Sequence, residues 1–381
     1  MDSFRVRPGD IQSREDLRKI PPSAKEELRQ AGLTALISQE YHSSELLSSK
    51  TTGSTGVPLE VFKSPVENWI HLLIRLRSMR YFGYHSRLKT MKISFDKPRP
   101  IIWQWLSFLG FYRQSVVPMT LPPAQIALRV LERRPDVVLG IPTILALVAG
   151  EIHSRNPTFR LPFAVTGAEL LTPGLKRQIE TVFGRVFNTY ASIETQHPIA
   201  FDCLTEPCMH VNDQAVILEI LDEDGEPVKE GETGEVVLTS LHSFSMPIIR
   251  YRMGDLAIAG PSDCPCGYPG TVIRSLEGRR SDYFLLPNGE KFLAIGAAHV
   301  IQKLADWILQ YELVQESITD VQLRIVPISS PSEDEKLRLL EAVEGCFGGE
   351  VEVTIRLVPN LESGPGGKFR VIRTRLGSPY D

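Results

Sequence analysis

Apolar residues recur at a helical spacing through the stretch 65–82, which reads "PVENWIHLLIRLRSMRYF". This spacing predicts a helix with one apolar face. The residues expected on that face are Trp69, Leu72, Leu73, Leu76 and Met79. Upstream, residues 14–30 are expected to form two short helical pieces that Pro21 and Pro22 separate.

A second pattern follows, in which short apolar runs alternate with helical repeats. The runs at 135–140, 163–167 and 185–191 are typical of buried strands. Helical repeats at 142–153 and 172–184 separate them, and this alternation predicts a parallel sheet with helices on its faces. Such sheets bind ligands at the carboxyl ends of their strands. We therefore expect a ligand site at "TGAEL", 166–170, and "YASIE", 190–194.

From about Ala215 the pattern changes to strands joined by Asp/Gly turns, which predicts an antiparallel or β-barrel-like subdomain. After "EGRRSD" a smaller α+β unit is expected, with a boundary at Asp282. Its predicted elements are a helix near 298–309, a strand near 320–327, a helix near 333–347 and a strand near 351–358. The predicted fold class is thus α/β plus α+β. It comprises an N-terminal domain, 1–281, whose β subdomain begins at about 211, and a small C-terminal domain, 282–381.

Composition narrows the protein class. The chain has 381 residues and a formal net charge of −4, which gives no global reason to expect nucleic acid or an anionic membrane as a partner. No apolar signal segment follows Met1, and the longest apolar stretch, near 137–150, is too short to span a bilayer. The five cysteines are an odd number, which suits a reducing compartment. A cytoplasmic location is therefore expected.

The stretch "TTGSTGVP", 51–58, has two interpretations. Small polar residues are sufficient for a flexible linker. Glycines that admit an anion to backbone N–H groups, with hydroxyls between them, also suit a phosphate-binding loop. The stretch is not a Walker loop, because no Gly-Lys-Ser/Thr follows. Taken alone, its composition favours the linker.

Five stretches in order decide between these interpretations. They are "TTGSTGVP", "TGAEL", "YASIE", "YRMGD" with "EGRRSD", and "GGKFR" at 366–370. Together they resemble the adenylate-forming superfamily of acyl- and aryl-CoA ligases. Within this superfamily the chain resembles the branch of the phenylacetate–CoA ligases and capsular polysaccharide biosynthesis proteins. Four further stretches carry this resemblance: "RPDVVLGIPTILALVA", "HVND", "CPCG" and "GKFRVI". The resemblance runs from about Gln12 to Leu376 and favours the phosphate loop.

The resemblance implies an ATP site with Mg²⁺, and the residue types suit this chemistry. Glu194 is the expected Mg²⁺ ligand, Tyr190 the ring that stacks on adenine, and Asp255 the acceptor from the ribose hydroxyls. Arg279 is expected to reach ribose or phosphate. The other expected ATP-binding residues are Thr51, Thr52, Gly53, Ser54, Thr55, Gly56, Gly167, Ala168, Glu169, Ala191 and Ser192, and Ala191 stands where the family usually has glycine.

The same resemblance makes Lys368 the expected catalytic lysine of a mobile C-terminal domain, with Asp282 as its hinge. Lys368 lies in a Gly-rich loop that can bring a compact cation to the α-phosphate. By position in the family layout, the expected acyl pocket contains Phe111, Tyr112, Ile141 and Pro142, which favour a flat or apolar acid.

Four cysteines are paired along the chain, as C-x4-C and C-P-C-G. A tight turn can point two sulfurs the same way, so we expect a structural Zn²⁺. The alternative is reduced, buried thiols. The expected zinc ligands are Cys203, Cys208, Cys264 and Cys266, with His210 as a substitute.

The expected activity is that of an ATP- and Mg²⁺-dependent ligase that forms an acyl- or aryl-adenylate and then a thioester with CoA. Two alternatives stay open: transfer of the acyl group to a carrier protein or an amine, and a non-catalytic assembly protein on the same scaffold. The retained Glu194, Asp255, Arg279 and Lys368 argue against the last alternative. A homodimer is also left open.

Overall fold

The computed structural model describes residues 6–50, 59–94, 101–195, 197–280, 283–361 and 370–376. By its internal contacts the chain forms two compact units. The first comprises residues 1–82 and 190–281, and the second residues 83–189 and 282–381. Each unit therefore uses two separate stretches of sequence.

The first unit contains an antiparallel sheet with the strand order β10-β11-β12-β13-β9-β8. Its core is a cluster of buried apolar residues that includes Ile199, Val236 and Ile273. The change to antiparallel strands expected after Ala215 is confirmed. The helices are α1 (Lys25–Ala31), α2 (Leu33–Leu36) and α3 (Pro65–Tyr81), and the strands are β1 (Leu47–Lys50), β2 (Glu60–Lys63), β8 (Pro198–Asp202), β9 (Met209–Val211), β10 (Val216–Leu221), β11 (Thr233–Ser240), β12 (Tyr251–Ala259) and β13 (Val272–Arg279).

The predicted apolar face of α3 is wrong in part. Trp69 and Leu73 are 47% and 63% exposed, whereas Glu67 and His71 are buried. Buried polar groups need partners, and Glu67 has them: its carboxylate accepts hydrogen bonds from the backbone N–H groups of Ser64 and Ser245. The capping contact with Ser64 and the loop contact with Ser245 therefore determine which face of α3 is buried, and the apolar repeat does not.

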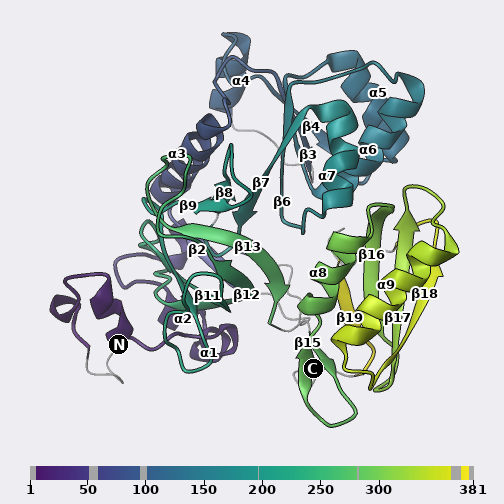
Figure 1. Cartoon of the computed structure of the whole chain (residues 1–381). Helices are drawn as coiled ribbons and strands as arrows, with labels where there is room; N and C mark the ends of the chain where they lie inside the picture. The colour runs from purple at the N-terminus through teal and green to yellow at the C-terminus, as the bar shows by residue number, and fades with distance from the viewer. Residues whose placement is uncertain are drawn as a thin grey trace. The chain divides into compact units, whose positions relative to one another are not determined.

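The second unit contains the predicted parallel sheet, in the order β7-β6-β5-β3-β4. Helices α5, α6 and α7 lie beside it in Figure 1 and share one apolar core with its strands. The elements of this part are β3 (Thr90–Ser94), α4 (Ile101–Phe108), β4 (Gln114–Pro118), α5 (Pro123–Arg133), β5 (Val137–Gly140), α6 (Pro142–Arg155), β6 (Phe163–Gly167), α7 (Pro173–Phe183) and β7 (Arg185–Ala191), whose last two residues belong to the first unit.

The C-terminal stretch adds a four-stranded sheet in the order β18-β17-β16-β19 (Figure 1). The helix predicted near 298–309 ends at Leu304, and the following residues form β16, a strand that the sequence analysis missed. The α/β plus α+β class is confirmed, while the boundary at Asp282 stays a prediction. The elements here are β14 (Tyr283–Leu285), β15 (Lys291–Leu293), α8 (Ile295–Leu304), β16 (Ile308–Gln315), β17 (Asp320–Pro327), α9 (Glu333–Cys346), β18 (Glu352–Leu357) and β19 (Ile372–Thr374).

Helix α7 and strand β16 are in close contact within the second unit. A Cβ atom added to Gly174 would lie 2.1 Å from the carbonyl oxygen of Ile308, so only glycine fits at this position. Elsewhere, among the described residues, no helix is both long enough and apolar enough to span a membrane.

Candidate functional site

The structure brings together three of the predicted nucleotide-binding residues in the first unit. Asp255 on β12 and Arg279 on β13 are register partners in the antiparallel ladder. The Nε atom of Arg279 lies 3.5 Å from Oδ1 of Asp255. The hydroxyl of Tyr190 donates a 2.6 Å hydrogen bond to Oδ2 of the same carboxylate. Both carboxylate oxygens of Asp255 therefore have a partner.

Tyr190 occupies the end of β7 and is 9% exposed. Its burial, together with the neighbouring carboxylate of Asp255, raises the pKa of the phenol well above its usual value. Tyr190 therefore stays neutral and acts as a donor to Asp255 at physiological pH. This contact fixes the ring against the antiparallel sheet.

Glu194 lies in the turn that follows β7. The hydroxyl of Tyr251, the first residue of β12, is 3.5 Å from Oε1 of Glu194. Tyr251 is buried. Its burial is the main reason that the pKa of its phenol is raised, and the charge of Glu194 is the second reason. Tyr251 stands within "YRMGD", but the local sequence does not predict its contact with Glu194, because this contact joins distant parts of the chain.

Lys25 on α1 is a second residue that the sequence analysis missed. Burial and the charge of Arg29 lower the pKa of its ammonium group, and the charge of Glu194 opposes this shift. The ammonium group of Lys25 thus interacts electrostatically with Glu194, the predicted metal ligand. Nothing in the local sequence around Lys25 signals this position, because α1 reaches the turn only through the fold.

Ala191 and Ser192, the other predicted ATP-binding residues of "YASIE", lie between Tyr190 and this turn. Ala191 is the exposed last residue of β7, and the hydroxyl of Ser192 accepts a hydrogen bond from the backbone N–H of Thr195 at 3.2 Å. Ser192 therefore closes the turn that carries Glu194.

In the second unit, Gly167, Ala168 and Glu169 follow the carboxyl end of β6, as predicted. A Cβ atom at Gly167 would lie 2.8 Å from the carbonyl oxygen of Thr189, and Ala168 has a φ of 72°, in the left-handed region. The carboxylate of Glu169 accepts a 3.2 Å hydrogen bond from the backbone N–H of Thr143. Tight packing and strain thus shape this loop.

Glu169 also contributes to a small pocket within the second unit. The pocket lies between the β6–α7 loop with the start of α7, strand β16 and the residue before β19. Gln310 of β16 donates a 3.2 Å hydrogen bond to the hydroxyl of Thr143, which links the same loop region to the C-terminal sheet. The lining residues are Glu169, Leu170, Thr172, Leu175, Gln310, Tyr311 and Val371.

The four residues predicted for the acyl pocket lie at two ends of the parallel sheet. Ile141 and Pro142 follow the carboxyl end of β5, next to β6. Phe111 and Tyr112 instead precede the amino end of β4, where the backbone N–H of Tyr112 contacts the carbonyl of Ser86. The structure does not bring the two pairs together, because the connection after α4 leads to the opposite edge of the sheet.

Three predicted features lie outside the described residues: the phosphate loop, Lys368 and Asp282. The phosphate-loop residues are Thr51, Thr52, Gly53, Ser54, Thr55 and Gly56. The flanks of this stretch are described: β1 and β2 pair antiparallel, with Lys50 opposite Glu60. The described residues on either side of the predicted phosphate loop therefore belong to two paired strands.

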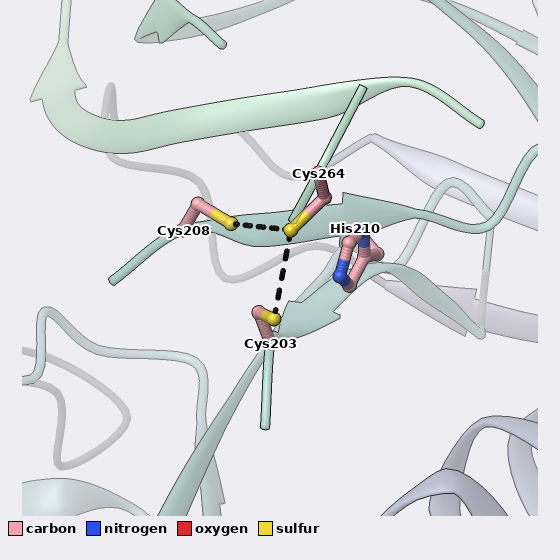
Figure 2. A group of neighbouring side chains, drawn as sticks. All are labelled: Cys203, Cys208, His210 and Cys264. Atoms are coloured by element: carbon pink, nitrogen blue, oxygen red, sulfur yellow. Dashed lines mark hydrogen bonds between the residues drawn. The ribbon is translucent and has the colours of Figure 1, made fainter. Parts of the chain in front are cut away.

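Cys203, Cys208 and Cys264 converge in the first unit, as Figure 2 shows. The Sγ atoms of Cys203 and Cys264 are 3.8 Å apart, and those of Cys208 and Cys264 are 3.9 Å apart. A disulfide requires about 2.05 Å, and all five cysteines are free. Two thiolates on a tetrahedral zinc ion, each at about 2.3 Å, lie about 3.8 Å apart. The observed spacing fits a zinc site.

The four groups that lie within 4.8 Å of one another are Cys203, Cys208, His210 and Cys264. His210, the expected substitute ligand, lies with three of the four expected cysteines in this group, and its imidazole comes from β9. Cys266 stays close, with its Sγ 3.2 Å from Nε2 of His210. The ring of Tyr268 lies against His210 at 4.6 Å between centroids.

Comparisons with known proteins agree with this fold. The family model of the CapK C-terminal domain matches residues 284–375. The chain is 26% identical to the phenylacetate–coenzyme A ligase of Thermus thermophilus over 87% of this chain and 76% of that protein. It is 21% identical to Protein CapK of Staphylococcus aureus, over 93% of this chain and 79% of that protein.

Among solved structures, a 2-hydroxyisobutyryl-CoA ligase in the postadenylation state matches with a TM-score of 0.79 and 20% identity. The match covers 98% of this chain and 84% of that one. The fold and the sequence relatives are similar to those of the adenylate-forming superfamily, the class of the AMP-forming acid–CoA ligases. Within this class the sequence is similar to the phenylacetate–CoA ligase-like branch that includes CapK.

Proposed function

We propose that this chain activates a carboxylic acid with ATP as an acyl-adenylate and then transfers the acyl group to the thiol of CoA. The likeness to the phenylacetate–CoA ligases and CapK supports the reaction class. The observation that carries the proposal is the carboxylate of Asp255, held between the hydroxyl of Tyr190 and the guanidinium of Arg279. The phenylacetate–coenzyme A ligases among the relatives favour an aryl acid.

In the first half-reaction a carboxylate oxygen attacks the α-phosphorus of ATP, and the bond to pyrophosphate breaks. An anion thus attacks an anion, so the site must stabilise negative charge in the transition state. We assign this role to Lys368 and to the phosphate loop, 51–56. In the second half-reaction the CoA thiolate attacks the acyl carbon, and AMP leaves.

The residues of the first unit would hold the nucleoside. Asp255 is 20% exposed at its side chain, so its carboxylate can accept hydrogen bonds from ribose hydroxyls while it keeps the contact with Tyr190. The Tyr190 ring provides an apolar face for adenine. Arg279, half exposed beside Asp255, can reach ribose or phosphate.

Magnesium fits Glu194, because the ion prefers carboxylate and phosphate oxygens and needs few protein ligands. Its contribution, when it is bound, is to neutralise phosphate charge. The chain's own part is to fix the Glu194 carboxylate through the turn closed by Ser192 and the hydroxyl of Tyr251.

We also propose a structural zinc ion on Cys203, Cys208, His210 and Cys264. Three sulfurs and one imidazole are a preferred donor set for tetrahedral zinc. The Nδ1 atom of His210 is buried without a hydrogen-bond partner among the described residues. One ring nitrogen is therefore available to bind a metal ion. The site would tie the loop after β8 to the β12–β13 connection.

Two half-reactions on one variant test the catalytic proposal. Lys368→Ala should slow adenylate formation by about 10²–10³-fold, the usual cost of losing one preorganised electrostatic contact. It should bind ATP normally and still convert chemically supplied acyl-AMP and CoA to the thioester. Lys336→Ala, a lysine on α9, is the control and should change neither half-reaction. Equal slowing of both half-reactions by Lys368→Ala would contradict the assignment.

The proposed hinge predicts the opposite pattern. Asp282→Pro restricts the backbone at the predicted pivot, so thioester formation should stall while adenylation survives. Replacing CoA by a carrier protein or an amine in the same assay tests the alternative acceptors. AMP release that needs one of these and not CoA would contradict transfer to CoA.

A further inference from the structure

Exposed basic side chains gather at the amino ends of the strands of the parallel sheet, and we call this surface the basic edge. This edge consists of the amino ends of the strands, the last turns of α5, α6 and α7, and the loops between them, at 83–89, 109–113, 132–136, 151–162 and 180–185. All of its arginines and lysines are exposed. They are Arg87, Lys89, Arg113, Arg133, Arg134, Arg155, Arg160 and Arg185, against four acidic residues, Glu132, Asp136, Glu151 and Glu180.

Backbone contacts make this edge one continuous surface. Arg113 donates a 2.7 Å hydrogen bond from its guanidinium to the carbonyl of Arg87. The backbone N–H of Asp136 bonds to the carbonyl of Lys89 at 2.8 Å, which joins the β3 and β5 ends. Phe163, three residues after Arg160, is the register partner of Arg185 at the β6 and β7 ends. The charges therefore follow one edge of one sheet.

The acidic residues do not balance this surface. Glu151 is already paired with Arg155, and Asp136 accepts a hydrogen bond from the backbone N–H of Lys89. The chain as a whole carries a net charge of −4, so the edge is positive on a protein that is negative overall. This asymmetry is local, and the composition of the full chain conceals it.

An exposed apolar stripe adjoins the basic edge. Trp105, Phe108 and Leu109 have the i, i+3, i+4 spacing of one helical face and are 64%, 83% and 65% exposed. The chain then continues through Phe111, which is 38% exposed, directly to Arg113 at the start of β4. Helix α4 thus ends at the basic edge, and its apolar stripe faces solvent.

Apolar exposure of this kind marks a binding surface. Aromatic and leucine side chains beside arginines and lysines are the combination that inserts into the interface of an anionic bilayer. A nucleic acid or an acidic protein would use the basic edge but would leave Trp105, Phe108 and Leu109 in water. Charge and apolar area together therefore favour lipid.

We propose that α4 and the basic edge form a docking surface for an anionic lipid bilayer. The apolar stripe enters the headgroup region, and the arginines and lysines contact anionic headgroups. The carboxyl ends of β5 and β6, with Ile141 and Gly167, lie at the opposite edge of the sheet. A bilayer bound at α4 therefore leaves those strand ends free.

Cosedimentation of the full chain with lipid vesicles tests the proposal. Binding is expected to vesicles with about 30% phosphatidylserine, and weak binding to phosphatidylcholine alone. Salt should weaken binding, because it screens the charges. The fluorescence of Trp105 should shift to shorter wavelength on binding, and Trp105→Phe should remove most of that shift.

Two variants separate the contributions of charge and apolar area. Arg87→Ser with Arg113→Ser should lower the partition coefficient by at least about tenfold, because each basic residue near an anionic surface is worth about fivefold. Trp105→Ser with Phe108→Ser should lower binding to a similar extent. Both variants remove exposed side chains, so circular dichroism and melting should stay at wild-type values.

The matched control is Leu337→Ser with Arg338→Ser, an exposed leucine and arginine on α9. This variant should bind vesicles like the wild type. Equal loss in the control variant, binding that is indifferent to phosphatidylserine, or no vesicle binding would overturn the proposal. A dimer that dissociates on Trp105→Ser with Phe108→Ser, without vesicle binding, would instead assign the stripe to a second copy of the chain.

Discussion

The hydroxyl of Tyr190 lies 2.6 Å from a carboxylate oxygen of Asp255, and this contact joins the end of β7 to strand β12. The two residues are 65 positions apart in the sequence. The contact is charge-assisted, since Asp255 is the acceptor and a neutral phenol the donor. It gives Tyr190 a second proposed role, that of a positioning residue for the carboxylate that would bind ribose.

Tyr190→Phe should therefore weaken ATP binding while it keeps the ring for adenine. The loss of one hydrogen bond to a charged group predicts a rise in KM for ATP of about tenfold, or about 1.4 kcal/mol. The KM for the acid should stay the same. Pyrophosphate exchange at varied ATP measures both. An unchanged KM for ATP, or an equal rise in both KM values, would argue against the positioning role.

Glu194→Gln should abolish most Mg²⁺-dependent adenylation and leave the melting temperature unchanged, because it removes a metal ligand and not a packing group. The activity that is left should need much more Mg²⁺. Glu226→Gln, at an exposed turn before β11, is the control. Wild-type pyrophosphate release by Glu194→Gln at limiting Mg²⁺ would refute the assignment.

Removal of zinc should destabilise the first unit. Metal analysis should find about one zinc ion per chain, and a chelator should lower the melting temperature, because metal binding contributes to folding free energy. Cys264→Ser should reproduce the effect, since Cys264 lies next to two other sulfurs. Cys346→Ser on α9 is the control. Rapid titration of all five thiols in the native, metal-free protein would exclude the site.

Stability should fall in mild acid because of a pair of buried histidines. The rings of His71 and His197 are 5.2 Å apart, and both are buried. Burial lowers the pKa of His197 to about 4, and burial also lowers the pKa of His71. The unfolded chain takes up protons near pH 6.5 whereas the folded chain does not, so the free energy of unfolding decreases as the pH falls from about 6.5 toward 4.

The slope is at most about 1.4 kcal/mol for each pH unit and each histidine. His197→Gln should flatten the dependence of the melting temperature on pH over this range. The same change at His153, an exposed residue of α6, should not. A wild-type slope in His197→Gln would show that other groups cause the acid sensitivity.

The sequence predicted the local elements better than the contacts between them. The strand expected at 163–167 and the one at 185–191 coincide with β6 and β7, because short apolar runs between turn residues suit buried parallel strands. We did not predict β16 from the sequence. The residues between the end of α8 at Leu304 and the start of β16 at Ile308 include no glycine or proline that would mark a break. As a result we also did not predict the contact of Gln310 with Thr143.

Site residues were predictable where a motif carries them and not where the fold brings them in. Asp255 and Arg279 each stand in a recognisable stretch, and their register pairing follows from the β12–β13 ladder. Tyr251 and Lys25 approach Glu194 only through tertiary structure. His210 was expected only as a substitute ligand, and β9 brings it into the group with Cys203, Cys208 and Cys264.

The most direct test of the proposed chemistry follows one oxygen atom. The acid that gives the fastest pyrophosphate exchange is labelled with oxygen-18 in its carboxylate and incubated with ATP, Mg²⁺ and CoA. If the carboxylate attacks the α-phosphorus and CoA then takes the acyl group, the AMP that is released carries one labelled oxygen, as mass spectrometry of the nucleotide shows. Label in inorganic phosphate with ADP as the nucleotide product, or unlabelled AMP, would contradict the acyl-adenylate.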